Sequence, residues 1–150
     1  MKNKNPVLSG REHTDARQRV AEVREALLRL HKALLESERA SYERVFCKIE
    51  SSYQFLQLVT NDPWFAWLRP VTQLIVAMDE LLELKEPLTA TDAEALVGQA
   101  KTLLVPTVDG EGFSHHYDEA LQRDPDVVFA HAAAARLFRT ETGKRAFPKG

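Results

Sequence analysis

The chain has 150 residues, and its 20 Lys and Arg against 22 Asp and Glu give a formal net charge of −2 at pH 7. This length fits one domain that buries most of its apolar surface on folding. The near-neutral balance argues against a general nucleic-acid binder, whose affinity would come from neutralised phosphates. A single cysteine, Cys47, excludes an internal disulfide framework and any multi-cysteine metal site.

Neither the beginning of the sequence nor its most apolar stretch has the pattern of a targeting or membrane segment. Residues 1–10 are polar apart from Val7 and Leu8, so they hold no hydrophobic signal core. The apolar stretch from Val71 to Met78 is far shorter than the roughly 20 residues that a membrane span needs. We therefore expect a cytoplasmic protein.

The first predicted helix is unusually long. Residues 1–13 lack periodicity and are expected to form a disordered lead, and a helical pattern begins at Thr14 or Asp15. Apolar residues then recur at spacings of three and four along one face: Val20, Val23, Leu27, Leu30 and Leu34. No Gly or Pro interrupts the pattern before Ile49, so we predict about 30 helical residues or more, spanning roughly 45 Å. Such a helix either bends near Ser37–Ser41 or extends past the domain onto another subunit.

The most apolar predicted helix follows Asn61-Asp62-Pro63, which supplies an N-cap aspartate and a proline at the first helical position. From Trp64 to Leu84, apolar residues cover most of the helix circumference, which is typical of a helix at the centre of a bundle. Pro70 lies inside this pattern. It is predicted to kink the helix, because its nitrogen cannot bond the Ala66 carbonyl.

Two capping boxes predict further helix starts. Ser51 with Gln54 would begin a short helix over residues 52–60, and Thr91 with Glu94 would begin a helix that ends before Pro106.

Two helices complete the prediction. A short one runs from Phe113 or Ser114 to Gln122, and Asp124-Pro125 starts the last one, with Gly143 at its end. Residues 143–150 are expected to form a flexible basic tail. Because no period-two alternation is present, the sequence predicts an all-α, single-domain helical bundle over residues 14–142.

Four segments resemble a family of small bacterial proteins. The stretch from Phe55 to Pro70 (FLQLVTNDPWFAWLRP) resembles the family's NDPWFAWLRP-type core, and Leu35–Arg39 (LESER), Tyr42–Arg44 (YER) and Gln122–Pro125 (QRDP) are also similar. The resemblance covers about residues 27–138 and implies a bacterial origin and an all-helical fold. The family is uncharacterised, so the resemblance implies no activity, ligand or site residue.

A His- and acid-rich segment is the candidate metal site. His115 with Asp118, and His116 with Glu119, are three residues apart and share a helix face, so each pair has the spacing to chelate a divalent metal. The structural alternative is a solvated acidic helix start, where carboxylates interact favourably with the helix dipole.

Three other titratable residues on predicted helices have both a functional and a structural interpretation. His31 and His131 could be further metal ligands or pH switches, although a half-buried histidine with one hydrogen-bond partner is the commoner case. Asp79, at the shoulder of the apolar helix, could be a catalytic acid with a raised pKa, or an edge residue paired with a base.

A candidate binding surface contains Trp64, Trp67 and Arg69. Aromatic anchors dominate binding energetics, and the arginine could pair with Asp62 or with a carboxylate of a partner. At helical spacing, however, the tryptophans are equally typical of a core.

Taken together, these features predict a non-catalytic helical interaction module that forms a homodimer, because the first helix is overlong and no catalytic constellation converges. One alternative is a metal- or small-ligand-binding bundle that uses the His115–Glu119 segment. A second alternative is an enzyme with Asp79 in a central pocket. A divalent metal is the sole cofactor considered, and neither nucleic acid nor a membrane is an expected partner.

Overall fold

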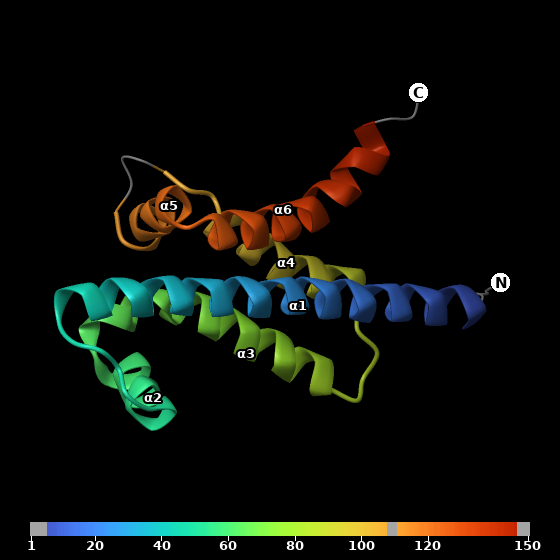
Figure 1. Ribbon diagram of the computed structural model, residues 1–150. Helices are drawn as coiled ribbons and strands as arrows, with labels where there is room; N and C mark the ends of the chain where they lie inside the picture. The colour runs from blue at the N-terminus through green and yellow to red at the C-terminus, as the bar shows by residue number, and fades with distance from the viewer. Residues whose placement is uncertain (1–5, 108–110, 147–150) are drawn as a thin grey trace.

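The computed structural model describes the backbone of residues 6–107 and 111–146, and the side chains of residues 15–107 and 111–139. Over these ranges the chain is all-α, as predicted, and contains no β-strand. The elements are α1 (Pro6–Val45), α2 (Ser52–Asn61), the 3₁₀ helix η1 (Pro63–Leu68), α3 (Arg69–Glu83), α4 (Ala90–Leu103), α5 (Phe113–Arg123) and α6 (Pro125–Ala146) (Figure 1). In this part of the chain, every helix is too short or too polar to cross a membrane.

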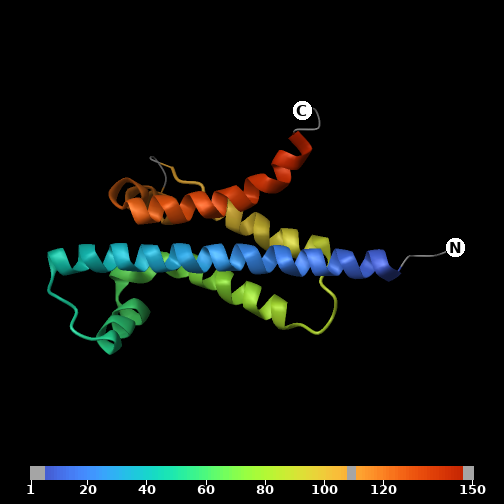
Figure 2. The same cartoon turned by 45° about the vertical axis from the view of Figure 1, so that its right-hand side comes forward.

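Helix α1 is the axis of the bundle. Its 40 residues correspond to about 60 Å. It is straight in both views, so the bend near Ser37–Ser41, one of the two predicted alternatives, is absent (Figures 1 and 2). Helix α3 packs along one side of α1, and α4 and α6 pack along the other (Figure 1). The predicted apolar face of α1 is confirmed, since Val20, Val23, Leu27, Leu30 and Leu34 are all buried.

The prediction that the segment from Trp64 to Leu84 forms one kinked central helix is wrong. The segment divides into η1 and α3, and Pro70 is in the first turn of α3. A proline costs little there, because backbone N–H groups of the first turn have no partner within the helix. The predicted N-cap is confirmed, since Asp62 Oδ1 accepts a hydrogen bond from the Trp64 backbone N–H at 2.8 Å. Helix α1, which contacts α3, α4 and α6, takes the central place instead.

Both ends of the described chain are more helical than predicted. Helix α1 begins at Pro6, so residues 6–13, expected to be disordered, are helical. Helix α6 passes the predicted end at Gly143 and continues to Ala146. Extending an existing helix costs far less than starting one, and a single interior glycine costs only about 1 kcal/mol. The remainder of the predicted lead (1–5) and of the tail (147–150) lies outside the described residues.

Side-chain caps begin two of the shorter helices. Ser51 Oγ accepts from the Gln54 backbone N–H at 3.0 Å, as predicted, but the Gln54 side chain accepts from the Glu50 N–H at 2.8 Å rather than from Ser51. Helix α4, in contrast, is capped by Thr89, whose Oγ accepts from the Asp92 N–H at 3.1 Å. The predicted cap at Thr91 is therefore two residues too late, because both threonines are followed three residues later by an acidic residue.

Candidate functional site

A cavity of about 520 Å³ lies between α1, η1 and α5. Helix α5 lies near the end of the bundle where α1 ends (Figure 1). Pockets that hold small molecules typically measure about 300–1,000 Å³. Three elements far apart in the sequence line it: Glu38, Ser41, Arg44 and Val45 from α1; Pro63, Trp64 and Trp67 from η1; and His116, Glu119 and Arg123 from α5.

The 3₁₀ geometry of η1 directs its aromatic side chains. With three residues per turn, side chains three positions apart are eclipsed. Trp64 and Trp67 therefore project from one face and line the cavity, while Phe65 and Leu68 project from another and are both only 2% exposed. The chain has two tryptophans, so both belong to this site.

Aromatic contacts hold the two indoles in place. The Trp67 ring stacks on His116, with centroids 5.2 Å apart and an interplanar angle of 22°. Trp64 makes edge contacts with Tyr42 at 5.8 Å and with Phe46 at 5.6 Å. The buried Nε1 of Trp64 has no hydrogen-bond partner among the described residues, and an unsatisfied buried donor costs roughly 1–3 kcal/mol. The cavity thus has walls of closely packed aromatic rings.

An ion pair joins α1 to α5 at the border of the cavity. Arg123 donates to Glu38 Oε2 at 2.7 Å and to Ser37 Oγ at 3.0 and 3.1 Å. Glu38 is 7% exposed, so its carboxylate depends on these partners for the hydrogen bonds it loses to burial. Sequence reasoning missed this pair, although a signal existed: Glu38 lies four residues after Leu34, on the apolar face of α1.

The predicted metal ligands come together only in pairs in the described part of the chain. Glu119 lies 3.3 Å from His115 Nε2 and 4.0 Å from His116 Nδ1. Within the described ranges, however, no group of three or more His, Cys, Asp or Glu side chains could hold a metal ion. His115 and His116 therefore both lie beside Glu119, and Asp118, which was predicted to pair with His115, takes part in neither contact. His116 and Glu119 line the aromatic cavity instead.

Of the other predicted site residues, some line the cavity and some lie outside it. Trp64 and Trp67 line the cavity, whereas Arg69 is exposed at the start of α3 and is not a lining residue. Asp79 accepts a hydrogen bond from Arg24 Nε and joins α3 to α1. Asp79 is therefore an edge carboxylate paired with a base, the structural alternative to a catalytic acid.

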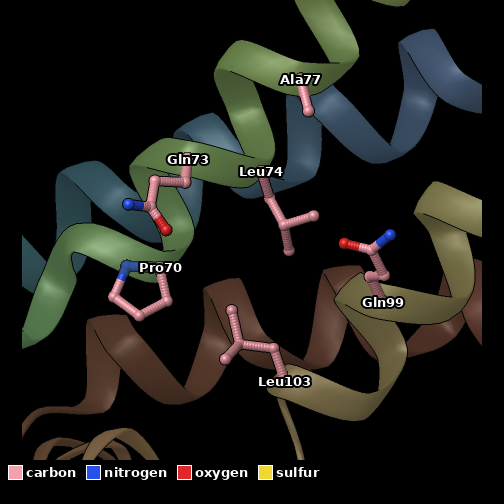
Figure 3. A pocket seen from close by; sticks show the side chains of 6 residues that line it. All are labelled: Pro70, Gln73, Leu74, Ala77, Gln99 and Leu103. Carbon is pink, nitrogen blue, oxygen red and sulfur yellow. The ribbon is translucent and has the colours of Figure 1, made fainter.

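A smaller cavity of about 240 Å³ lies between α3 and α4. Leu74 and Leu103 point toward one another from the two helices, with Gln73 and Gln99 at the sides (Figure 3). Its size is below the usual range for ligand sites, and it has no charged lining residue. Of these two cavities, the one between α1, η1 and α5 is therefore the stronger candidate.

His31 and His131 are half-buried, each with one hydrogen-bond partner, which is the commoner of the two cases considered. His31 Nε2 lies 3.1 Å from Thr72 Oγ1, and His131 Nδ1 lies 2.6 Å from the hydroxyl of the fully buried Tyr117. Burial lowers the pKa of both histidines. Burial also raises the pKa of Tyr117, so this hydroxyl stays protonated and can donate a hydrogen bond to Nδ1 of neutral His131.

Lowering the pH from about 7.5 to 5.5 is expected to reduce the free energy of unfolding. The folded pKa of each histidine is lowered from its ordinary value of 6.5, so the unfolded chain takes up protons first. The stabilising contribution is complete above pH 6.5 and is lost as the pH falls toward the folded pKa. Urea unfolding at several pH values measures this loss. His131→Gln should flatten it, and an unchanged pH dependence in this variant would contradict the prediction.

Comparisons of the chain with protein-family models, curated proteins and solved structures find no match. The resemblance to the NDPWFAWLRP-type family therefore stays a prediction. The segments that carry it nevertheless meet at the cavity, since it is lined by Glu38 and Arg44, by the two tryptophans, and by Arg123. The geometry of this site is the basis for a functional hypothesis.

Proposed function

We propose that the protein binds a small molecule in the cavity between α1, η1 and α5. The observation that carries this proposal is the lining of the cavity, in which the face of η1 with both tryptophans lies opposite polar faces of α1 and α5. This combination of aromatic walls with a few polar groups is typical of small-ligand sites. It is the second of the functions that the sequence suggested, at a site that shares His116 and Glu119 with the predicted segment.

The side-chain contacts around the cavity favour a preorganised site. The stacked Trp67 and His116 rings hold one wall, and the Glu38–Arg123 pair connects α1 to α5. A site held in its binding geometry before the ligand arrives loses less conformational entropy on binding.

The dye 1-anilinonaphthalene-8-sulfonate tests this proposal, because it is an aromatic probe whose fluorescence rises in apolar sites. We expect one dye to bind per chain, with energy transfer from the two tryptophans. The substitution Ser41→Phe places a ring inside the cavity and should abolish binding. Ser52→Phe is the matched control, because Ser52 is exposed at the start of α2, outside the cavity. Unchanged dye affinity in Ser41→Phe, or no binding to the wild type, would overturn the proposal.

A homodimer is the second candidate, and a specific observation favours it. Large apolar side chains are exposed where α1 ends and along α2: Val45, Phe46, Tyr53 and Leu56. Both segments lie at the same end of the molecule (Figure 2). Exposed apolar clusters of this kind are typical of interaction surfaces, and we propose a second copy of this chain as the partner, in a bacterial cytoplasm.

Sedimentation velocity tests the dimer. The wild type should show a concentration-dependent dimer, and Tyr53→Ser with Leu56→Ser should shift it to monomer. Val76→Ser, which changes an exposed residue of α3, should leave the dimer intact. A wild type that is monomeric at every concentration refutes this candidate.

A further inference from the structure

The cavity contains a cation without an anionic partner. Arg44 donates to Ser41 Oγ at 3.1 Å. No carboxylate of the described residues lies within 4.0 Å of its guanidinium group. By contrast, Arg123, the other arginine of the lining, is paired with Glu38. The guanidinium of Arg44 is thus free to bind a carboxylate with two parallel hydrogen bonds.

The cavity also contains an anion without a strongly basic partner. Glu119 is contacted by His115 at 3.3 Å and lies 4.0 Å from His116, and no Lys or Arg of the described chain pairs with it. Its side chain is about half exposed. The Glu119 carboxylate is therefore available to accept hydrogen bonds from an ammonium group.

We propose that the ligand is a small zwitterion with a large apolar body, namely a free α-amino acid with an apolar side chain or a dipeptide of such residues. Its carboxylate binds Arg44, its ammonium group binds Glu119, and its apolar body packs against Trp64 and Trp67. This inference rests on the proposed small-molecule function and names its ligand class.

The charge pattern discriminates against other ligand classes. The two arginines and the two glutamates of the lining balance one another. A purely anionic ligand would meet Glu119, a purely cationic ligand would meet Arg44, and a neutral ligand would bury part of both without a partner. Each of these costs binding free energy that a zwitterion avoids.

Isothermal titration calorimetry with L-phenylalanine, N-acetyl-L-phenylalanine and L-phenylalaninamide tests the ligand class. The two derivatives lack the ammonium group and the carboxylate, respectively. We expect L-phenylalanine to bind at one site and each derivative to bind about tenfold weaker or worse, because each loses a charged hydrogen bond. L-Phenylalanyl-L-phenylalanine distinguishes a free amino acid from a dipeptide as the ligand. Tighter binding than that of L-phenylalanine identifies a dipeptide ligand.

Two variants test which residue binds each charged group of the ligand. Arg44→Gln should weaken binding of L-phenylalanine but not of the amide. Glu119→Gln should weaken binding of L-phenylalanine but not of the N-acetyl derivative. Arg69→Gln and Glu80→Gln are the matched controls, because both residues are exposed outside the cavity and should change neither affinity.

Equal binding of L-phenylalanine and its two derivatives would overturn the proposal of a zwitterionic ligand. The absence of binding by both the amino acid and the dipeptide would also overturn it. The dye experiment separates this failure from failure of the proposed function. If the dye binds and Ser41→Phe abolishes this binding, the cavity is a binding site even when no zwitterion binds. If neither the dye nor a zwitterion binds, the proposed site is rejected altogether.

Discussion

Replacing Phe65 by alanine is expected to lower the free energy of unfolding by about 3–5 kcal/mol. Phe65 is 2% exposed, and its ring packs against Tyr42 at 5.7 Å and Phe55 at 5.8 Å. Removing the ring loses its transfer free energy and leaves a void that rigid aromatic neighbours cannot fill. Urea unfolding followed by far-ultraviolet circular dichroism measures the loss.

The matched control is Phe129→Ala, the same substitution at a ring that is 71% exposed on α6. It should change the free energy of unfolding by no more than about 0.5 kcal/mol. Equal losses in the two variants would show that η1 is not packed as the structure places it. Because Phe65 anchors a different face of η1 from the one that carries the tryptophans, Phe65→Ala should also weaken dye binding at concentrations of urea where the fold persists.

Much of the fold could be predicted from local patterns, because local chemistry determines it. The three-four spacing of apolar residues in α1 requires one buried face, and those residues are buried. Ser51 and Asp62 accept hydrogen bonds from helix N-termini as predicted. Such features depend on residues within one turn of each other, so a single sequence contains the necessary information.

The division into η1 and α3 could not be read from spacing alone. Over six residues, apolar positions three apart fit both an α-helix and a 3₁₀ helix, so Trp64 and Trp67 were compatible with either. The outcome was determined by packing, because the turn before Pro70 places Phe65 and Leu68 in the core. The 3₁₀ conformation also brings both indoles to one face of η1.

The candidate site was only partly predictable, since it forms from segments that are distant in the sequence. Trp64, Trp67, His116 and Glu119 were each named from local chemistry, but as two separate sites. Their convergence depends on the position of α5 against η1, which no local pattern determines. The same reason applies to the predicted metal ligands, because helical spacing brings them together only in pairs and no other described segment adds a third ligand.

Arg123→Ala is expected to lower the free energy of unfolding by about 2–4 kcal/mol, because it leaves the buried Glu38 carboxylate without its charged partner. The lower end of this range reflects the partial exposure of Arg123, whose side chain is 31% accessible. Urea unfolding of Arg123→Ala measures the loss, and Arg69→Ala, at an exposed arginine, should stay within about 0.5 kcal/mol of the wild type.

A double-mutant cycle separates the ion pair from the loss of packing around Arg123. Glu38→Gln keeps the volume of the side chain and removes its charge, so Arg123→Ala should cost much less in that background than in the wild type. The pair also holds α1 against α5 beside the cavity, so each single variant should weaken dye binding, whereas Arg69→Ala should not. Arg123→Ala could instead lower the free energy of unfolding equally in the wild type and in Glu38→Gln. That result would mean that the Glu38 charge is not stabilised by Arg123. The connection between α1 and α5 would then have to rest on the hydroxyl of Ser37, to which Arg123 also donates.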